Sequence, residues 1–272
     1  MLKKRIILFV LCAVVIAVLF WLPKAVVENS SQLESGAIRD SAIAKIQTNP
    51  HGKSSVAVMA QIKDLRARYL STSQKEKNAI FADSLANLYR NAGKFDSAAW
   101  FGEAAATFFN TNESFLKAGN HYYEAFTFAV DAKKQKALAA KTRFFFAKFL
   151  VAEPKDLDVK TKMAMTYVSS SSPMQGIRML REVLAVDPKN EAALFNMGML
   201  SIQSGQFDRA IERLLQLIDV NPKHLQGQLL LGMAYMNKGD KAKARKQFEK
   251  VKKLDSDPSV QATADSYLKD LK

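Results

Sequence analysis

The chain repeats itself at an interval of 34 residues. Three sets of residues follow this interval: Pro154, Pro188 and Pro222; Ala164, Gly198 and Gly232; and Met165, Met199 and Met233. A fixed step of this length is typical of stacked helix-turn-helix units, because each unit is too small to bury its own apolar face and is stable only against its neighbours. The sequence therefore predicts an all-α, right-handed solenoid whose function resides in its surfaces rather than in a catalytic cleft.

The residues within each period indicate the kind of repeat. In the stretch 191–224 they are Leu194, Met197, Gly198, Gly205, Phe207, Ala210, Leu214 and Pro222. This set resembles the tetratricopeptide pattern at successive consensus positions, with one departure, Ser201, where the family usually has tyrosine. Tyr167 and Tyr235 hold that position one period before and one period after.

The same register continues on both sides of this stretch. Repeats are predicted at 157–190 and 225–258, and a fourth at 79–111 has the matching residues Leu85, Ala86, Tyr89, Gly93, Phe95, Ala98 and Ala105. The segment 112–156 is about eleven residues too long for one repeat. We interpret it as an irregular repeat with an extended first helix over 122–129, a turn near 131–134 and a second helix through Leu150.

Two further helices are expected at the ends of the array. An amphipathic helix is predicted from Ser54 to Leu70, and Asp257 before Pro258 starts a capping helix over 259–271. The solenoid therefore spans 54–272. The resemblance covers residues 79–272 and implies a scaffold that binds a protein or peptide partner, since the fold serves many partners and rarely carries chemistry.

The N-terminus has the pattern of a membrane anchor. Lys3, Lys4 and Arg5 precede an uncharged run over 6–22, which as a helix reaches ~26 Å and meets the lower limit for spanning a bilayer. Cys12 lies within it and is expected to be an inert thiol facing lipid. We expect residues 1–23 to be a retained signal anchor and 24–53 a tether.

The charge distribution around this run predicts its orientation. Basic residues before the run place the N-terminus in the cytoplasm, so the repeats are expected in the periplasm of a bacterial inner membrane, on a single-pass protein. Two alternatives stay open: a cleaved signal peptide that releases a soluble periplasmic adaptor, and a mitochondrial outer-membrane receptor whose repeats face the cytosol.

No motif in the sequence supplies a nucleophile with its base, a phosphate loop or a set of metal ligands. His51, His121 and His224 are isolated, and only His121 with Glu124 has a spacing that a helical metal site would use. A solvated or capping role is expected for His51 and His224. We therefore expect no enzyme activity, no metal and no cofactor.

The first helices of tetratricopeptide repeats line an inner groove, and the resemblance places an apolar, methionine-rich set there. Its members are Met165, Val168, Phe195, Met199, Ile202, Leu229, Met233 and Met236. Methionine suits a surface that accepts varied apolar partners. The alternatives are that the chain's own helices fill this groove or that it seals a homo-oligomer. A clamp for a terminal carboxylate is not expected, because Asn87 and Asn120 match such a site but the later positions are methionines.

The chain is strongly basic, with a formal net charge of +14. A basic patch is predicted near the C-terminus, made of Lys241, Lys243, Arg245, Lys246, Lys250, Lys252 and Lys253. It is interpreted either as a solvated helix exterior or as a dock for anionic lipid or an acidic partner. Nucleic-acid binding is disfavoured, because no reader motif accompanies the charge.

Overall fold

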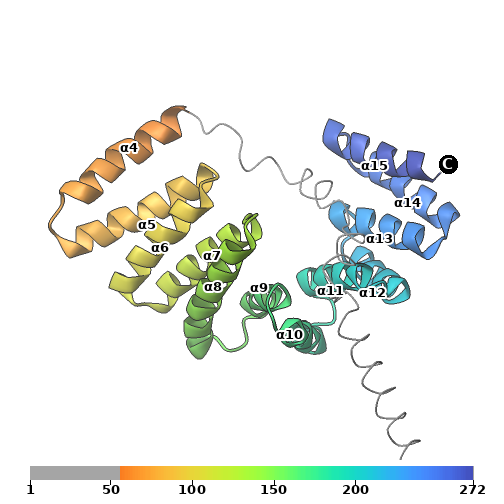
Figure 1. Cartoon of the computed structure of the whole chain (residues 1–272), viewed down its shortest axis with the longest axis horizontal. Coiled ribbons are helices and arrows are strands. Elements are labelled where there is room, and N and C mark those ends of the chain that lie inside the picture. Colours follow the sequence, from red (N-terminus) through yellow and green to blue (C-terminus); the bar gives the residue numbers. More distant parts are fainter. Residues whose placement is uncertain (1–55, 272) are drawn as a thin grey trace, which may run out of the picture. The chain divides into compact units, whose positions relative to one another are not determined.

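The computed structural model describes residues 56–271, which form twelve α-helices and no strand (Figure 1). In chain order they are α4 (Val56–Ser71), α5 (Lys75–Asn91), α6 (Phe95–Phe109), α7 (Asn112–Thr127), α8 (Ala132–Ala152), α9 (Leu157–Val168), α10 (Pro173–Val186), α11 (Glu191–Gln203), α12 (Phe207–Val220), α13 (Leu225–Lys238), α14 (Lys241–Leu254) and α15 (Pro258–Asp270). The predicted span 6–22 with Cys12, the tether 24–53 and His51 lie outside the described residues. Within 56–271, no helix combines the length and the apolar character that crossing a bilayer requires.

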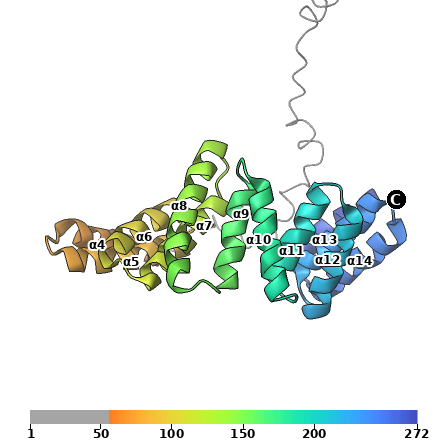
Figure 2. The same cartoon turned by 90° about the horizontal axis from the view of Figure 1, so that it is seen from below.

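Five helix pairs, α5–α6, α7–α8, α9–α10, α11–α12 and α13–α14, follow one another along the chain (Figures 1 and 2). The two helices of each pair pack together, and each pair packs on the next. The first helices also meet across pairs, α7 with α9, α9 with α11 and α11 with α13. α4 packs on α5 and α15 on α14, so each end of the array is closed by a single helix.

Small residues let the helices of a pair approach closely. A Cβ added at Gly119 in α7 would lie 2.4 Å from Cδ1 of Phe146 in α8, and one added at Gly232 in α13 would lie 2.6 Å from Cε1 of Phe248 in α14. Both phenylalanines are fully buried. Only glycine leaves room for the phenylalanine rings at these positions. Such close contacts between the two helices of a pair form the core.

The residues that cap the helix N-termini recur at the same 34-residue interval as the core residues. Asp156, Asn190 and His224, each one period apart, accept a hydrogen bond from the backbone N–H three residues ahead, at 2.8, 3.0 and 3.0 Å. Such caps satisfy backbone donors that have no partner inside the helix. The capping role that the sequence suggested for His224 is confirmed.

The irregular repeat differs from its prediction. Its first helix, α7, has 16 residues and is no longer than α5, with 17. The additional residues lie in α8, which has 21 residues against 14 in α10. The helix predicted over 122–129 is confirmed as far as Thr127 and ends two residues earlier than predicted, while most of the additional length, which was not predicted there, lies in α8. Asp131 caps α8 by accepting from the Lys134 N–H at 2.7 Å, and the alanine-rich sequence that follows favours continued helix.

Candidate protein-binding surface

The first helices of the five pairs, α5, α7, α9, α11 and α13, present a surface that we name the first-helix face. Ion pairs join α5 to α7 and a hydrogen bond joins α7 to α9, while α9 packs on α11 and α11 on α13, so the face is continuous. It has two parts of different chemistry. The part on α5, α7 and the start of α9 is charged, whereas the part on the rest of α9, α11 and α13 is apolar.

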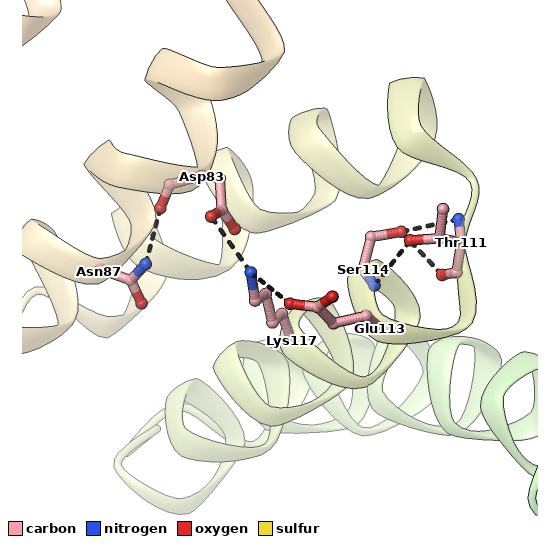
Figure 3. A network of polar contacts seen from close by, with 6 residues as sticks. All are labelled: Asp83, Asn87, Thr111, Glu113, Ser114 and Lys117. Atoms are coloured by element: carbon pink, nitrogen blue, oxygen red, sulfur yellow. Dashed lines mark hydrogen bonds and ion pairs between the residues drawn. The ribbon is translucent and has the colours of Figure 1, made fainter.

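The charged part contains two ion pairs between residues one period apart, which we name the polar ladder; Figure 3 shows the one between Asp83 and Lys117. Arg90 Nε on α5 donates to both carboxylate oxygens of Glu124 on α7, at 2.7 and 2.8 Å. Lys117 Nζ on α7 lies 3.3 Å from Asp83 on α5 and 3.0 Å from Glu113 on its own helix. The hydrogen bond with Glu113, together with Asp83, raises the pKa of Lys117. These groups are partly exposed, so each pair stabilises the fold by less than about 1 kcal/mol and acts mainly on register and surface charge.

Further polar contacts, outside the ladder, connect α7 with α9. Lys162 Nζ donates to Asn120 Oδ1 at 2.9 Å and pairs with Asp158 at 2.7 Å. Asn87 donates to the Asp83 backbone carbonyl at 3.1 Å. The two asparagines that match a carboxylate clamp are thus engaged within the chain itself.

His121 lies beneath the ladder, on α7. Only 5% of it is exposed, and its ring packs where a side chain at Gly102 would otherwise stand. Burial lowers the pKa of His121 to about 4, with Arg90 the next cause in the same direction. Its Nδ1 has no hydrogen-bond partner among the described residues. Because Glu124 binds Arg90, the His121–Glu124 pair is not arranged as a metal site.

The apolar part is only partly accessible. Met165, Val168, Phe195, Met199 and Met236 are half-buried, and the Phe195 ring stacks on His224 with a centroid distance of 5.3 Å. The other three members of the predicted set, Ile202, Leu229 and Met233, are 5%, 1% and 3% exposed. The accessible apolar surface is therefore smaller than the predicted set and centres on α9 and α11.

The predicted basic patch lies on α14, and two of its members are paired. Lys243 lies 3.0 Å from Asp240, and Lys252 lies 2.6 Å from Asp265. The other five, which have no ion pair to a carboxylate in the described part of the chain, are exposed: Lys241, Arg245, Lys246, Lys250 and Lys253. A concentrated positive charge thus remains available to solvent on one helix.

The sequence reasoning missed the polar ladder, although a signal for it exists. Asp83 and Lys117 are one period apart and opposite in charge, and so are Arg90 and Glu124. Adding the repeat interval to each charged residue of a first helix would have found both pairs.

Comparison with known proteins supports the repeat assignment. A tetratricopeptide repeat family model matches residues 195–259, and no curated protein matches the chain. A tetratricopeptide repeat protein from Parabacteroides merdae superimposes with a TM-score of 0.59 at 15% identity, covering 89% of each chain. MamA from Desulfovibrio magneticus superimposes with a TM-score of 0.50 at 18% identity, covering 65% of this chain and 94% of that one. Residues 195–259 therefore match a tetratricopeptide repeat model, and the described helices share the fold of a tetratricopeptide repeat protein.

Proposed function

We propose that this chain is a protein-binding scaffold, not an enzyme, and that it takes a peptide or an amphipathic helix on the first-helix face. The observation that carries the proposal is that apolar side chains and charged side chains lie next to each other on one row of helices. Half-buried methionines and Phe195 on α9 and α11 offer apolar contacts, while the polar ladder beside them offers fixed charges. Apolar anchors supply affinity and surrounding charges supply orientation and selectivity.

The nature of the anchors favours an apolar helical or extended partner. Met165 and Met199 have unbranched side chains that adapt to different apolar shapes at low cost. A helix that presents apolar residues at i, i+3 and i+4 would place them along such a row. Its charged flank would then meet Lys117, Glu124 and their partners.

The proposed setting is the periplasmic side of a bacterial inner membrane. Lys3, Lys4 and Arg5, followed by the uncharged run 6–22, support a single retained anchor with a cytoplasmic N-terminus. A scaffold held there would serve envelope protein assembly, secretion or cytochrome maturation. The alternative is a soluble periplasmic adaptor released by signal cleavage, and the intact mass of the mature protein distinguishes the two.

The test is crosslinking in the native membrane with a single charged substitution. Met199→Glu places a carboxylate on the accessible apolar part and is expected to abolish the partner crosslinks while helix content stays unchanged. Met233 is unsuitable for this purpose, because it is 3% exposed and a glutamate there would bury a charge.

Met174→Glu is the matched control, since Met174 on α10 is 63% exposed and lies on a second helix. It should leave the crosslinks intact. Crosslinks that survive Met199→Glu, or that are lost equally in both variants, contradict binding at the first-helix face.

A second candidate function rests on the five exposed cations of α14 that have no ion pair within residues 56–271. In this proposal the helix docks on anionic lipid headgroups, and tethering beside a membrane raises the local concentration of the binding groups. Binding of the full chain to phosphatidylglycerol vesicles should weaken between low and moderate salt. Lys246→Glu with Lys250→Glu should reduce it further, whereas salt-independent binding argues against this function.

A further inference from the structure

A cavity of about 230 Å³ opens among α10, α11 and α12. Its walls come from the second helices of two successive pairs and from the first helix between them, so it is separate from the apolar anchors of the first-helix face. Ile177, Met197 and Leu200 line the cavity with apolar side chains, and Ser201 lines it with a small polar side chain. A space of this size exceeds the ~150 Å³ that accommodates a benzene ring.

The cavity lies where the stretch 191–224 departs from the repeat pattern. Ser201 stands where the preceding and following repeats carry Tyr167 and Tyr235. Its hydroxyl donates to the Met197 carbonyl of its own helix at 2.8 Å, so it does not reach into the space. Compared with tyrosine, serine at this position lacks the aromatic ring, and the space of that ring is left open.

The neighbouring repeats show what normally surrounds that ring. The Arg143 guanidinium lies 4.8 Å from the centroid of Tyr167, and the Lys243 ammonium lies 5.5 Å from that of Tyr235. A cation over an aromatic face is an attractive arrangement. Arg209 stands one period before Lys243 and lines the cavity. At this repeat the cation is therefore present and the ring is missing.

The rim of the cavity is positively charged and partly fixed in place. Arg181, Arg209 and Arg213 line it against a single acidic residue, Glu212. None of the three arginines forms an ion pair with a carboxylate of residues 56–271. Arg209 Nη1 donates to Gln206 Oε1 at 2.5 Å, which holds the guanidinium at the opening.

We infer that this cavity binds a small aromatic carboxylate. The ring of the ligand takes the place of the missing tyrosine, between Ile177, Met197 and the Arg209 guanidinium. Its carboxylate pairs with the arginines of the rim, whose planar fork matches a carboxylate in two parallel hydrogen bonds. The same chemistry occurs in a free aromatic acid and at the C-terminal tyrosine of a polypeptide, and the small volume favours the free acid.

The test titrates 4-hydroxyphenylacetate into the full-length chain in detergent, with the methyl groups of isoleucine and methionine labelled for NMR. The expected result is saturable shifts at the Ile177 and Met197 methyls, with a dissociation constant on the order of 1 mM for so small a ligand. Met165 and Met236, on the first-helix face, should not shift. The neutral 4-hydroxyphenylacetamide should bind at least about tenfold more weakly, since it lacks the charge.

Substitutions at the cavity give the decisive comparison. Ser201→Tyr restores the ring and should eliminate binding, whereas Ser201→Ala keeps the space open and should retain it. Ser256→Tyr, at an exposed position between α14 and α15, is the matched control for adding a phenol. Arg209→Gln should weaken binding about tenfold, with Arg245→Gln as its control, and it tests the proposal even if Ser201→Tyr fails to fold.

In the titrations with acid and amide, three results would overturn the inference: no saturable shifts at Ile177 and Met197, equal binding of acid and amide, or unchanged binding in folded Ser201→Tyr. A further arm uses the peptide Gly-Gly-Gly-Tyr with a free C-terminus. Binding of the free acid with exclusion of the peptide supports the assignment to a small molecule. Tighter binding of the peptide overturns it in favour of a polypeptide end.

Discussion

Acid should destabilise the array through one buried histidine, and His121→Gln should remove that part of the effect. His121 is 5% exposed, and burial lowers the pKa of its imidazole from 6.5 to about 4. In the unfolded chain the ring is solvated and keeps its ordinary pKa. Between these two values the unfolded chain binds the proton and the folded chain does not, so stability falls as the pH falls.

The magnitude follows from the difference in pKa. The contribution of neutral His121 is fully present above pH 6.5 and is lost progressively down to pH 4. At about 1.36 kcal/mol per pH unit, lowering the pH from 6.5 to 5 costs about 2 kcal/mol of the free energy of unfolding. The charged groups around the ring are Arg90 and Asp83 on α5 and Lys117 on α7; Arg90 and Lys117 oppose protonation of the imidazole and Asp83 favours it.

The assay is urea unfolding of the full-length chain and of His121→Gln at pH 7 and pH 5, followed by circular dichroism. Glutamine does not titrate in this range, so the variant should lose about 2 kcal/mol less than the parent between the two pH values, whatever its absolute stability. Carboxylates that titrate near pH 5 affect both proteins alike and cancel in the comparison. An equal loss in both proteins, or an NMR titration of the His121 ring with a midpoint near 6.5, would refute the reasoning.

Two further substitutions test the packing and the helix ends. Gly119→Ala should destabilise the array by roughly 1–3 kcal/mol, because its Cβ would meet the buried Phe146 ring at 2.4 Å; a thermal melt measures this, and an unchanged melting temperature would show that the ring moves freely. Thr111→Ala should cost about 1 kcal/mol by removing the reciprocal cap with Ser114, whose N–H donates to Thr111 Oγ1 at 3.2 Å (Figure 3). Its effect should appear as faster amide hydrogen exchange in the first turn of α7, and exchange equal to the parent would contradict it.

The period of the sequence was sufficient to predict the helix pairs, because the residues that set it are those that pack. Gly198 and Gly232 mark where first helices approach second ones, and Pro154, Pro188 and Pro222 stand in the turns between pairs. These are local constraints that repeat, so each occurrence supports the others. The all-α repeat fold that they predicted is confirmed over the described residues.

The end of the first helix and the length of the second helix in the irregular repeat could not be predicted closely, because this repeat has no second copy to fix its register. Apolar residues continue through 122–129, and the break at Phe128 to Val130 carries no glycine or proline to mark it. The helix ends before Asp131, which caps the next helix, and the apolar pattern alone does not predict that end. The depth of burial on the first-helix face was equally hidden, because Met199 and Met233 occupy the same position of the repeat, yet Met199 is half-buried and Met233 is only 3% exposed.

The polar ladder has a consequence for how such a protein can be rebuilt. Each of its pairs is split between neighbouring units, with Asp83 and Arg90 on one and Lys117 and Glu124 on the next. A unit excised and grafted alone would carry half of each pair and present unmatched charge to its new neighbour. The smallest segment that can be transferred with both ion pairs complete is therefore the block of two helix pairs from α5 through α8.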